Sequence, residues 1–465
     1  MIRQELEYSL CDVFRQMVKY KESIFQEEIE VVEQSPLFIA SLTLQEHPML
    51  NVKKVLREKY YNVIKYFVLN QNRDEYVNAR LRKYGLLLIG SSDINVNAST
   101  LKADIIATIN CKYMPWRKKY RYGILSDIAL VLIDKNYIAK AYKEISTYMQ
   151  EGQHHLLDEF KNVLYDYQAD ISRFVWSEYL INQYKSNIVF LEQNEVRIIV
   201  SATMSAGKST LINALIGKKI AKTSQEVCTG NKCYISSKPY EDNVTYLRND
   251  EFYCDASNNE LESISWNNES NVSTYFRLLD GNSRRICFID TPGVNSAINR
   301  NHGRITKKAL VNERFDKVVY VLNANKLGTE EEMSYLKWFA ENVEKNKVIF
   351  VLNKIDDFIA AEDDIAESIY GVKNDLISLG FKNPIICPIS AYFSLLLKMK
   401  AYNEELSEDE EDEYQLYVKK FNKPAYDLSE YYLHATLSEA DGEMVAMSKK
   451  CGLYGLEKMI LRGAV

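Results

Sequence analysis

The sequence predicts an all-α helical region followed by an α/β domain with a mixed, mostly parallel, doubly wound sheet. Only 17 Gly and 8 Pro occur among the 465 residues, which favours long helices. Apolar residues recur at helical spacing before about residue 190, whereas short β-rich apolar runs, each followed by a helix, begin near residue 195. We therefore expect two domains, residues 1–190 and residues 191–465.

Composition narrows the classes of partner and compartment. The formal net charge of -6 gives no overall attraction to nucleic acid, so we expect no nucleic-acid partner, and we expect the basic cluster at residues 116–119 to be solvated surface. The 8 cysteines show no CxxC spacing, which predicts neither a zinc site nor a disulfide framework and fits a reducing cytoplasm. No charged-then-apolar leader opens the sequence, and no uncharged apolar run reaches the roughly 18 residues of a membrane span. We expect a cytoplasmic protein, with peripheral contact to a membrane left open.

Helical periodicity organises residues 1–190. One apolar stripe covers residues 6–24, and Pro36 is expected to close that helix. A second stripe covers residues 157–181 and is long enough to resemble one coiled-coil or bundle seam. Further helices are expected at 51–70, 99–112 and 124–150, with residues 85–90 as the one short strand-like run. His47, His154 and His155 lack metal-ligand spacing, so the region is expected to be a bundle, with a membrane-binding or partner-binding helix as the alternative.

The second half alternates strands with helices. The expected strands are residues 196–201, 232–236, 243–247, 285–290, 317–322, 347–353 and 384–389. Dense acidic residues near 404–413 are expected to form a solvated surface loop or a frayed helix start. A last helix at 452–461 is expected to pack back on the sheet.

A phosphate-binding loop is predicted between the strand at 197–201 and the helix at 210–216. In such a loop backbone N–H groups and the helix N-terminus surround a β-phosphate, Lys208 neutralises the β- and γ-phosphates, and Ser209 ligates magnesium. The usual pattern starts with glycine, and Ala202 stands there instead; alanine costs little if its φ is negative. The expected nucleotide contacts from this loop are Met204, Ser205, Ala206, Gly207, Lys208, Ser209 and Thr210.

Two further turns are predicted beside the phosphates. Asp290 ends a strand and should hold Mg²⁺ through water, while Gly293 offers a backbone N–H to the γ-phosphate. Thr229, just before another strand, is our choice for a hydroxyl ligand of the magnesium ion. Thr223 and Ser224 compete with it for that role.

A guanine-reading motif follows the strand at 347–353. Asp356 can accept hydrogen bonds from the ring N–H and the exocyclic amine of guanine, a donor pair that adenine lacks. Lys354 can lie along the base plane, and Asn353 would tie neighbouring loops together. Ser390 and Ala391 match the last element, whose backbone N–H contacts the guanine oxygen. Five elements in this order, each at the carboxyl end of a predicted strand, predict a P-loop GTPase domain with GTP and GDP as ligands.

Four segments, residues 205–215, 290–293, 327–332 and 353–356, together resemble the G domain of bacterial dynamin-like proteins. The resemblance covers residues 195–465 and leaves the N-terminal helical region unrecognised. It implies hydrolysis of GTP to GDP and phosphate without a separate exchange factor, and a homodimer through the nucleotide face of the G domain. An extended stalk, a lipid-binding domain and an apolar paddle, which membrane-remodelling members carry, are not visible.

Compared with the GTPases that it resembles, this chain lacks glutamine at two positions of the catalytic machinery. Dynamins place Gln two residues after the position of Ala202, where this chain has Met204, and the Ras-type Gln is replaced by Val294. The catalytic candidates are therefore Lys208, Ser205, Thr229 and Gly293. Ser205 matches the family's P-loop serine, which would help to hold a charge-compensating cation such as K⁺, or a partner loop. Arg300, His302 and Arg304 either reach the developing phosphate charge or are surface residues.

Three functional hypotheses follow. The first is a GTPase accelerated when G domains pair or when a partner supplies the missing group. The second is a slowly hydrolysing switch that displays the N-terminal helices to a protein partner, as in a bacterial defence or signalling module. The third is a membrane-remodelling machine.

Overall fold

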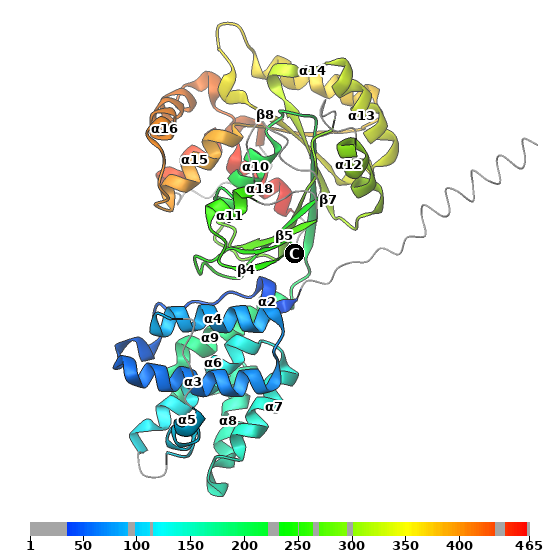
Figure 1. Cartoon of the computed structure of the whole chain (residues 1–465). Coiled ribbons are helices and arrows are strands. Elements are labelled where there is room, and N and C mark those ends of the chain that lie inside the picture. Colours follow the sequence, from blue (N-terminus) through cyan, green and yellow to red (C-terminus); the bar gives the residue numbers. More distant parts are fainter. Residues whose placement is uncertain are drawn as a thin grey trace, which may run out of the picture. The chain divides into compact units, whose positions relative to one another are not determined.

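The computed structural model of the chain describes residues 35–91, 98–111, 115–221, 232–249, 251–263, 269–294, 301–432 and 442–462 (Figure 1). The apolar stripe expected at residues 6–24 lies outside these ranges. Ser35–Val465 form one compact unit. The domain boundary near residue 190 stays a prediction, although one large hydrophobic cluster lies among the helices before it and another surrounds the sheet after it.

The described part of the N-terminal region is helical, as the sequence predicts. Its helices are α2 (Pro36–Ile39), α3 (Lys54–Gln71), α4 (Glu75–Ile89), α5 (Ala98–Ile105), α6 (Lys118–Leu132), α7 (Lys135–Ser146), α8 (His154–Tyr165) and α9 (Glu178–Leu191). Helix α6 is buried along most of its length, and helices α3, α4, α7 and α9 pack against it. Short turns join them: η1 (Pro48–Asn51), η2 (Ile106–Asn110), η3 (Pro115–Arg117), η4 (Glu151–Gln153) and η5 (Ser172–Ser177).

The strand expected at residues 85–90 is wrong, because these residues form the end of helix α4 and its C-cap. The Asp74 carboxylate accepts a 2.7 Å hydrogen bond from the Val77 N–H and caps the helix start. The helix ends at Gly90, whose φ of 76° suits a glycine. Leu86 is half exposed while Leu88 is fully buried, so the run follows a helical face. A short apolar run alone cannot distinguish a strand from a buried helix.

Two other helical expectations also needed correction. The stripe at residues 157–181 is not one seam, because the chain leaves the helix after α8, and Tyr167 is 58% exposed before α9 begins. The helix expected at 124–150 divides at Ile133, whose φ is 59°, and Asp134 caps α7. Pro36 is the first residue of α2, a position that proline favours because its missing N–H would have had no partner there; the helix that Pro36 was expected to close lies outside the described residues.

The strands that the structure describes form one mixed, mostly parallel nine-stranded sheet, in the order β4-β3-β5-β2-β6-β1-β7-β8-β9. Their bounds are β1 (Val196–Ala202), β2 (Cys233–Ser237), β3 (Tyr246–Arg248), β4 (Phe252–Cys254), β5 (Ser270–Thr274), β6 (Ile286–Asp290), β7 (Lys317–Asn323), β8 (Val348–Asn353) and β9 (Ile385–Ile389). The five strands from β6 to β9 in this order are parallel, so their carboxyl ends meet at one edge. The predicted fold class is confirmed.

Helices cover both faces of the sheet. Helices α12, α13 and α14 lie on one face, and α10, α15 and α18 lie on the other (Figure 1). Helix α18 packs into the sheet's hydrophobic core, as expected for the last helix. The bounds are α10 (Lys208–Ile216), α11 (Asn258–Ser263), α12 (Asn301–Asn312), α13 (Glu330–Asn342), α14 (Ile365–Ser378), α15 (Ala391–Ala401), α16 (Glu408–Phe421), α17 (Glu443–Lys450) and α18 (Leu453–Leu461), with turns η6 (Ala324–Lys326), η7 (Lys345–Lys347), η8 (Ile355–Asp357), η9 (Pro424–Tyr426) and η10 (Ser429–Tyr432).

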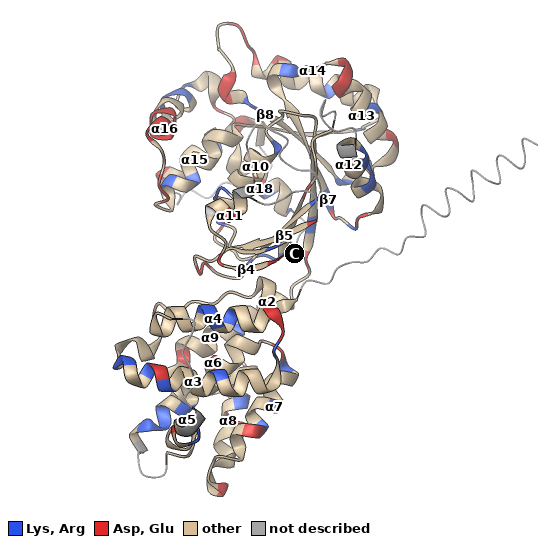
Figure 2. Ribbon diagram, viewed as in Figure 1, with Lys and Arg blue, Asp and Glu red and all other residues tan. Residues whose placement is uncertain are grey.

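The acidic block is the start of helix α16, the second of the two forms expected, so the surface loop is wrong for residues 408–413. Ser407 and Glu410 form a capping box, in which each side chain bonds the other's backbone N–H. Acidic residues in the first turn also interact favourably with the positive end of the helix dipole. Figure 2 shows α16 with acidic residues among the basic ones. The charges that suggest solvation therefore also stabilise this helix.

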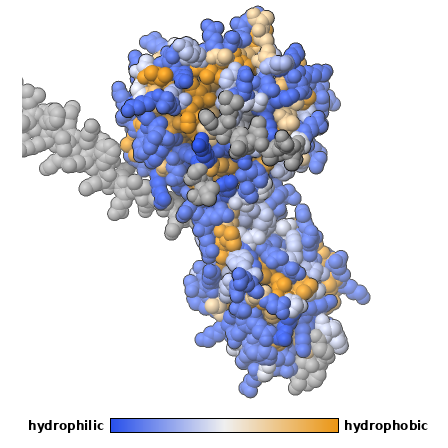
Figure 3. All heavy atoms as spheres, turned by 180° about the vertical axis from the view of Figure 1, so that it is seen from behind, coloured by the Kyte–Doolittle hydropathy of each residue, from blue (hydrophilic) through white to orange (hydrophobic). Residues whose placement is uncertain are grey.

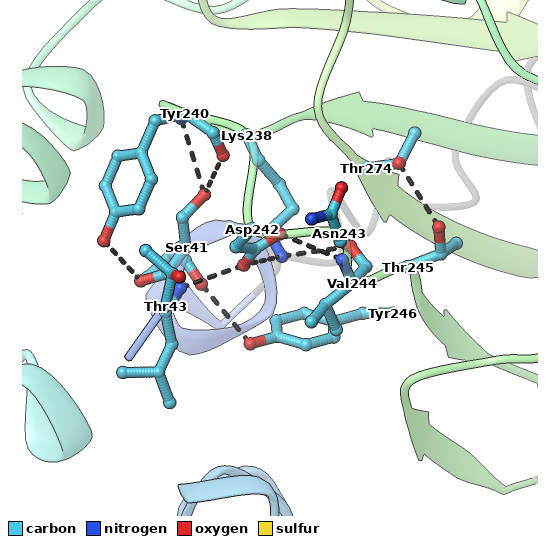
Figure 4. A network of polar contacts seen from close by, with 12 residues as sticks. Ser41, Thr43, Lys238, Tyr240, Asp242, Asn243, Val244, Thr245, Tyr246 and Thr274 are labelled. Atoms are coloured by element: carbon cyan, nitrogen blue, oxygen red, sulfur yellow. Dashed lines mark hydrogen bonds and ion pairs between the residues drawn. The ribbon is translucent and has the colours of Figure 1, made fainter. Parts of the chain in front are cut away.

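Residues 35–44 connect the helical region with the sheet domain (Figure 4). The Ser41 hydroxyl donates a 2.7 Å hydrogen bond to the Tyr240 carbonyl, and the Leu42 N–H donates to Asp242 Oδ2 at 2.9 Å. Both acceptors lie between β2 and β3. The segment is thus hydrogen-bonded directly to the sheet domain.

Arg80 of helix α4 holds the same segment from the other side. Its guanidinium, 1% exposed, donates to the Ala40 carbonyl at 2.7 Å, the Leu130 carbonyl at 2.6 Å and the Tyr246 hydroxyl at 3.1 Å. A buried cation is tolerated only when hydrogen bonds replace its hydration. Arg80 therefore joins α4, α6 and β3 in one network.

The face seen in Figure 3 is mostly hydrophilic with separate hydrophobic patches. In the part of the chain that the structure describes, no helix combines the length and apolar character that crossing a lipid bilayer requires.

Candidate nucleotide-binding site

The loop between β1 and α10 has a backbone that suits phosphate binding. Ser205 and Gly207 both have left-handed conformations, with φ of 63° and 85°. A side chain at position 207 would place its Cβ 2.4 Å from the Asn353 amide nitrogen, so only glycine fits. Ala202, at the end of β1, is fully buried in extended strand conformation, which alanine tolerates. Alternating left-handed residues direct successive N–H groups into one concavity, the arrangement that binds anions.

Two asparagines fix the orientation of this loop. Asn323 Nδ2 donates to the Ser205 carbonyl at 3.1 Å, and Asn353 Nδ2 donates to the Ala206 carbonyl at 2.9 Å. In a trans peptide the N–H points opposite to the C=O of the same unit. Holding these carbonyls therefore turns the N–H groups of Ala206 and Gly207 away from the asparagines. The pair aligns in register at the ends of β7 and β8.

Lys208 forms a buried ion pair with Asp290 at the floor of the loop. Lys208 opens α10, and Asp290 ends β6, which lies beside β1. Their side chains are only 8% and 2% exposed. Ser209 and Thr210 follow in the first turn of α10, where the helix dipole favours negative charge. The predicted cation and carboxylate are thus brought together.

The turn after β6 is joined to the phosphate loop. Thr203 and Val294 form a parallel bridge, and the Val294 N–H donates to the Ala202 carbonyl at 3.2 Å. A Cβ on Gly293 would meet Met204 Cγ at 3.4 Å, so Met204 lies next to Gly293. The Met204 side chain is 42% exposed. A thioether therefore occupies the position where the resemblance implies a glutamine, and it donates no hydrogen bond to water.

In the guanine-reading motif, one oxygen of the Asp356 carboxylate has no hydrogen-bond partner among the described residues. Lys354 has a left-handed φ of 72° and starts the turn η8 that contains Asp356. Within the described ranges, no hydrogen-bond partner is found for the buried Asp356 Oδ1. Burial raises the pKa of Asp356, and the Ser390 hydroxyl opposes that shift. A buried carboxylate oxygen without a protein partner is costly, and a ligand with N–H donors would satisfy it.

The last predicted element has its amides already engaged. The Ala391 N–H donates to Asn353 Oδ1 at 3.0 Å, and the Ser390 N–H donates to the Cys451 carbonyl at 3.1 Å. Asn353 thus ties this loop to the phosphate loop, as the sequence indicated. The contact of these amides with a guanine oxygen stays a prediction.

The sequence motifs did not identify Lys420 and Tyr426, which brace the guanine-reading loop. Lys420 Nζ donates to the carbonyls of Asp356 and Phe358, each at 2.6 Å. The Tyr426 hydroxyl donates to the Phe358 carbonyl at 3.2 Å, and the Lys420 ammonium lies 4.6 Å from the Tyr426 ring centroid. Both residues follow the acidic block, far beyond the motif, and no spacing rule points to them. Asn323 was also missed, although a polar residue at the carboxyl end of a predicted strand was a usable signal.

Several predicted site residues lie outside the residues that the structure describes. Thr229, Thr223, Ser224 and Arg300 fall in ranges that the structure does not describe, as does the side chain of His302. Arg304 lies on α12 and is exposed. Their roles stay predictions.

Part of the chain matches a known protein family and is similar to other proteins. Residues 198–355 match the family described as the dynamin family. A probable transmembrane GTPase FZO-like, chloroplastic, from Arabidopsis thaliana is 29% identical over 203 residues, which are 43% of this chain and 20% of that protein. An uncharacterised protein encoded in the xynA 3' region of Caldicellulosiruptor sp. (strain Rt8B.4) is 28% identical over 226 residues, which are 47% of this chain and 54% of that protein. The chain therefore spans about a fifth and about half of these relatives.

Two solved structures of proteins in complex with GDP also align with this chain. Era from Aquifex aeolicus aligns with 46% of this chain and 59% of its own, at a TM-score of 0.27 and 18% identity. Toc33 from Arabidopsis thaliana aligns with 45% of this chain and 78% of its own, at a TM-score of 0.29 and 14% identity. The match over residues 198–355 covers most of β1, the phosphate loop, Asp290 and the first residues of the guanine-reading motif, and it ends just before Asp356. Residues 198–355 therefore match the dynamin family, and this part of the chain is similar to dynamin-like large GTPases.

Proposed function

We propose that this protein binds GTP and hydrolyses it to GDP and phosphate. The observation that carries the proposal is the unpartnered Asp356 Oδ1 at the same sheet edge as the Lys208–Asp290 pair. Guanine supplies an N–H and an amine to a carboxylate, and a nucleotide phosphate supplies the negative charge that Lys208 would neutralise. The two groups together match both ends of a guanine nucleotide.

The residues at the phosphate end fit a magnesium ion as well. Mg²⁺ prefers oxygen ligands, and the Ser209 hydroxyl lies in the first turn of α10 while the Asp290 carboxylate lies at the carboxyl end of β6. Bound there, the ion would neutralise charge on the β- and γ-phosphates. The N–H groups of Ala206 and Gly207 would bind the same phosphates, and the Gly293 N–H would contact the γ-phosphate.

The proposed hydrolysis is slow in the isolated protein and faster when two G domains pair or when a partner supplies a water-positioning group. This is supported by Met204 and Val294, which stand where glutamines orient water in related GTPases, since neither side chain donates a hydrogen bond to water. A paired or partner-supplied polar group would restore that function. The same two residues also favour an alternative, a switch in which bound GTP persists and a partner protein binds the helical region.

Phosphate release by the full chain tests the proposal. Lys208→Ala should abolish GTP binding and turnover, while Lys337→Ala, which changes an exposed lysine on α13, should leave both unchanged. Turnover per molecule that rises with protein concentration would support pairing. Turnover that stays flat without any partner would contradict pairing and favour the switch. Hydrolysis that survives in the folded Lys208→Ala variant would overturn the site.

A further inference from the structure

A separate pocket lies between helices α13 and α14, which are neighbours in Figure 1. Its volume is about 220 Å³, enough for roughly seven waters at 30 Å³ each. Its walls are mainly aliphatic, from Leu322, Leu327, Met333, Leu336, Val372 and Leu376. The space suits a ligand of a few carbon atoms and is too small for a nucleotide, whose sites are usually larger than about 300 Å³.

Two carboxyl groups line this apolar pocket. Glu332 comes from the first turn of α13 and is only 3% exposed, and Asp375 comes from α14 and is exposed. The Gly328 N–H is the hydrogen-bond donor that acts on Glu332. One N–H cannot satisfy both oxygens of a carboxylate, which together accept about four hydrogen bonds.

The charge around Glu332 is unbalanced. Among the described groups that shift the pKa of Glu332, the charged one is Asp375, which has the same sign. Burial, the largest cause, and Asp375 raise that pKa to about 7, against the opposing Gly328 N–H. Tyr320 of β7 also lies within electrostatic reach, and burial keeps this phenol neutral by raising its pKa. Buried carboxylates in proteins are ordinarily paired with a cation, and here the surrounding elements supply none in the described ranges.

We propose that this pocket binds a small aliphatic ammonium or guanidinium compound, with the cation at Glu332 and Asp375 and the alkyl stem against the aliphatic walls. Such a ligand supplies what the pocket lacks, a positive charge, and matches its apolar lining. A neutral ligand of the same size would fill the walls and leave the carboxylates unpaired. An anionic one would be repelled.

Calorimetric titration of the nucleotide-free full chain at pH 8 tests this, with butylamine and agmatine as probes and butanol and butyrate as matched controls. We expect saturable binding of both cations and at least about tenfold weaker binding of the controls, since a charge-assisted hydrogen bond contributes more than that factor. Because no GTP is present, failure here is distinct from failure of the nucleotide site.

Two variants identify the pocket as the site. Glu332→Gln keeps the shape and removes the charge, and it should weaken butylamine binding about tenfold. Gly371→Leu should fill the pocket and weaken butylamine binding while both carboxyl groups remain, because a Cβ at position 371 meets no atom within 4 Å and leucine favours helix. Glu330→Gln, on the exposed side of the same helical turn, should leave binding unchanged. Equal binding to wild type and Glu332→Gln, tight butanol binding, or no saturable cation binding would overturn the proposal.

Discussion

Asn353 shows how one side chain can couple two parts of a site. Its amide nitrogen holds the Ala206 carbonyl and its amide oxygen accepts from the Ala391 N–H. The side chain is 2% exposed, so these hydrogen bonds have no competition from water. The sequence predicted this role because asparagine stands first in the guanine-reading motif. The matching function of Asn323 was not predicted, since its partner in the phosphate loop is set by strand register rather than by local spacing.

Glu332 should make stability depend on pH between its two pKa values. Its pKa in the folded protein is raised to about 7 from an ordinary 4.5. Between these values the folded state retains a proton that the unfolded state has lost, so stability present at lower pH is lost as pH rises to about 7. Without ligand, Glu332→Gln should be more stable than wild type at pH 8, by up to about 3 kcal/mol, and nearly equal to it at pH 4.5. Urea unfolding of both proteins across this range measures the difference; a constant difference would contradict the burial of this charge.

At the scale of elements, helix α16 shows that the acidic composition of a segment is not enough to predict what the segment contacts. Its acidic start reads as solvated surface, yet its last turn carries Lys420, which holds the backbone of the guanine-reading loop. The strands and their polar ends were predictable because apolar runs and motif spacing are local. The brace was not, because it depends on how a helix 64 residues away in sequence packs on the loop.

Removing the brace should weaken guanine-nucleotide binding without unfolding the protein. In Lys420→Met the aliphatic stem remains and the hydrogen bonds to the Asp356 and Phe358 carbonyls are lost. We expect GTP affinity to fall about tenfold because the loop must be ordered on binding. The neighbouring exposed Lys419→Met serves as the matched control. Fluorescent GTP analogue titration measures the affinity, and equal affinity in the two variants would show that Lys420 has no such role.

At the scale of the whole molecule, the buried pair Lys238–Asp242 anchors residues 35–44 to the sheet domain. Both side chains are fully buried with their charged atoms 2.5 Å apart, and the Lys238 ammonium lies 4.0 Å from the Tyr246 ring centroid. Burial lowers the pKa of Lys238 while Asp242 opposes that shift. Asp242 also accepts the Leu42 N–H, so one carboxylate serves the pair and the junction. No motif in the sequence marks this network, because its members are about 200 residues apart.

Asp242→Ala should therefore separate the unfolding of the helical region from that of the sheet domain. It leaves Lys238 buried without its carboxylate and removes the Leu42 acceptor, at a cost of about 3–5 kcal/mol. Calorimetry should show one transition in wild type and two in the variant. The double variant Lys238→Met with Asp242→Leu removes both charges and should recover most of the stability of the sheet domain. A single transition in Asp242→Ala with an unchanged midpoint would contradict this account of the junction.

We infer that Asp356 reads a guanine base at the edge of the parallel sheet. The most direct test of this claim is equilibrium binding of GTP, ATP and xanthosine triphosphate to wild type and to Asp356→Asn. Xanthine carries an oxygen in place of the guanine amine, which the asparagine amide can bond as a donor. Wild type should prefer GTP over both other nucleotides by about a hundredfold or more, and Asp356→Asn should prefer xanthosine triphosphate. Equal affinity of wild type for ATP and GTP, or an unchanged GTP preference in the variant, would contradict the claim.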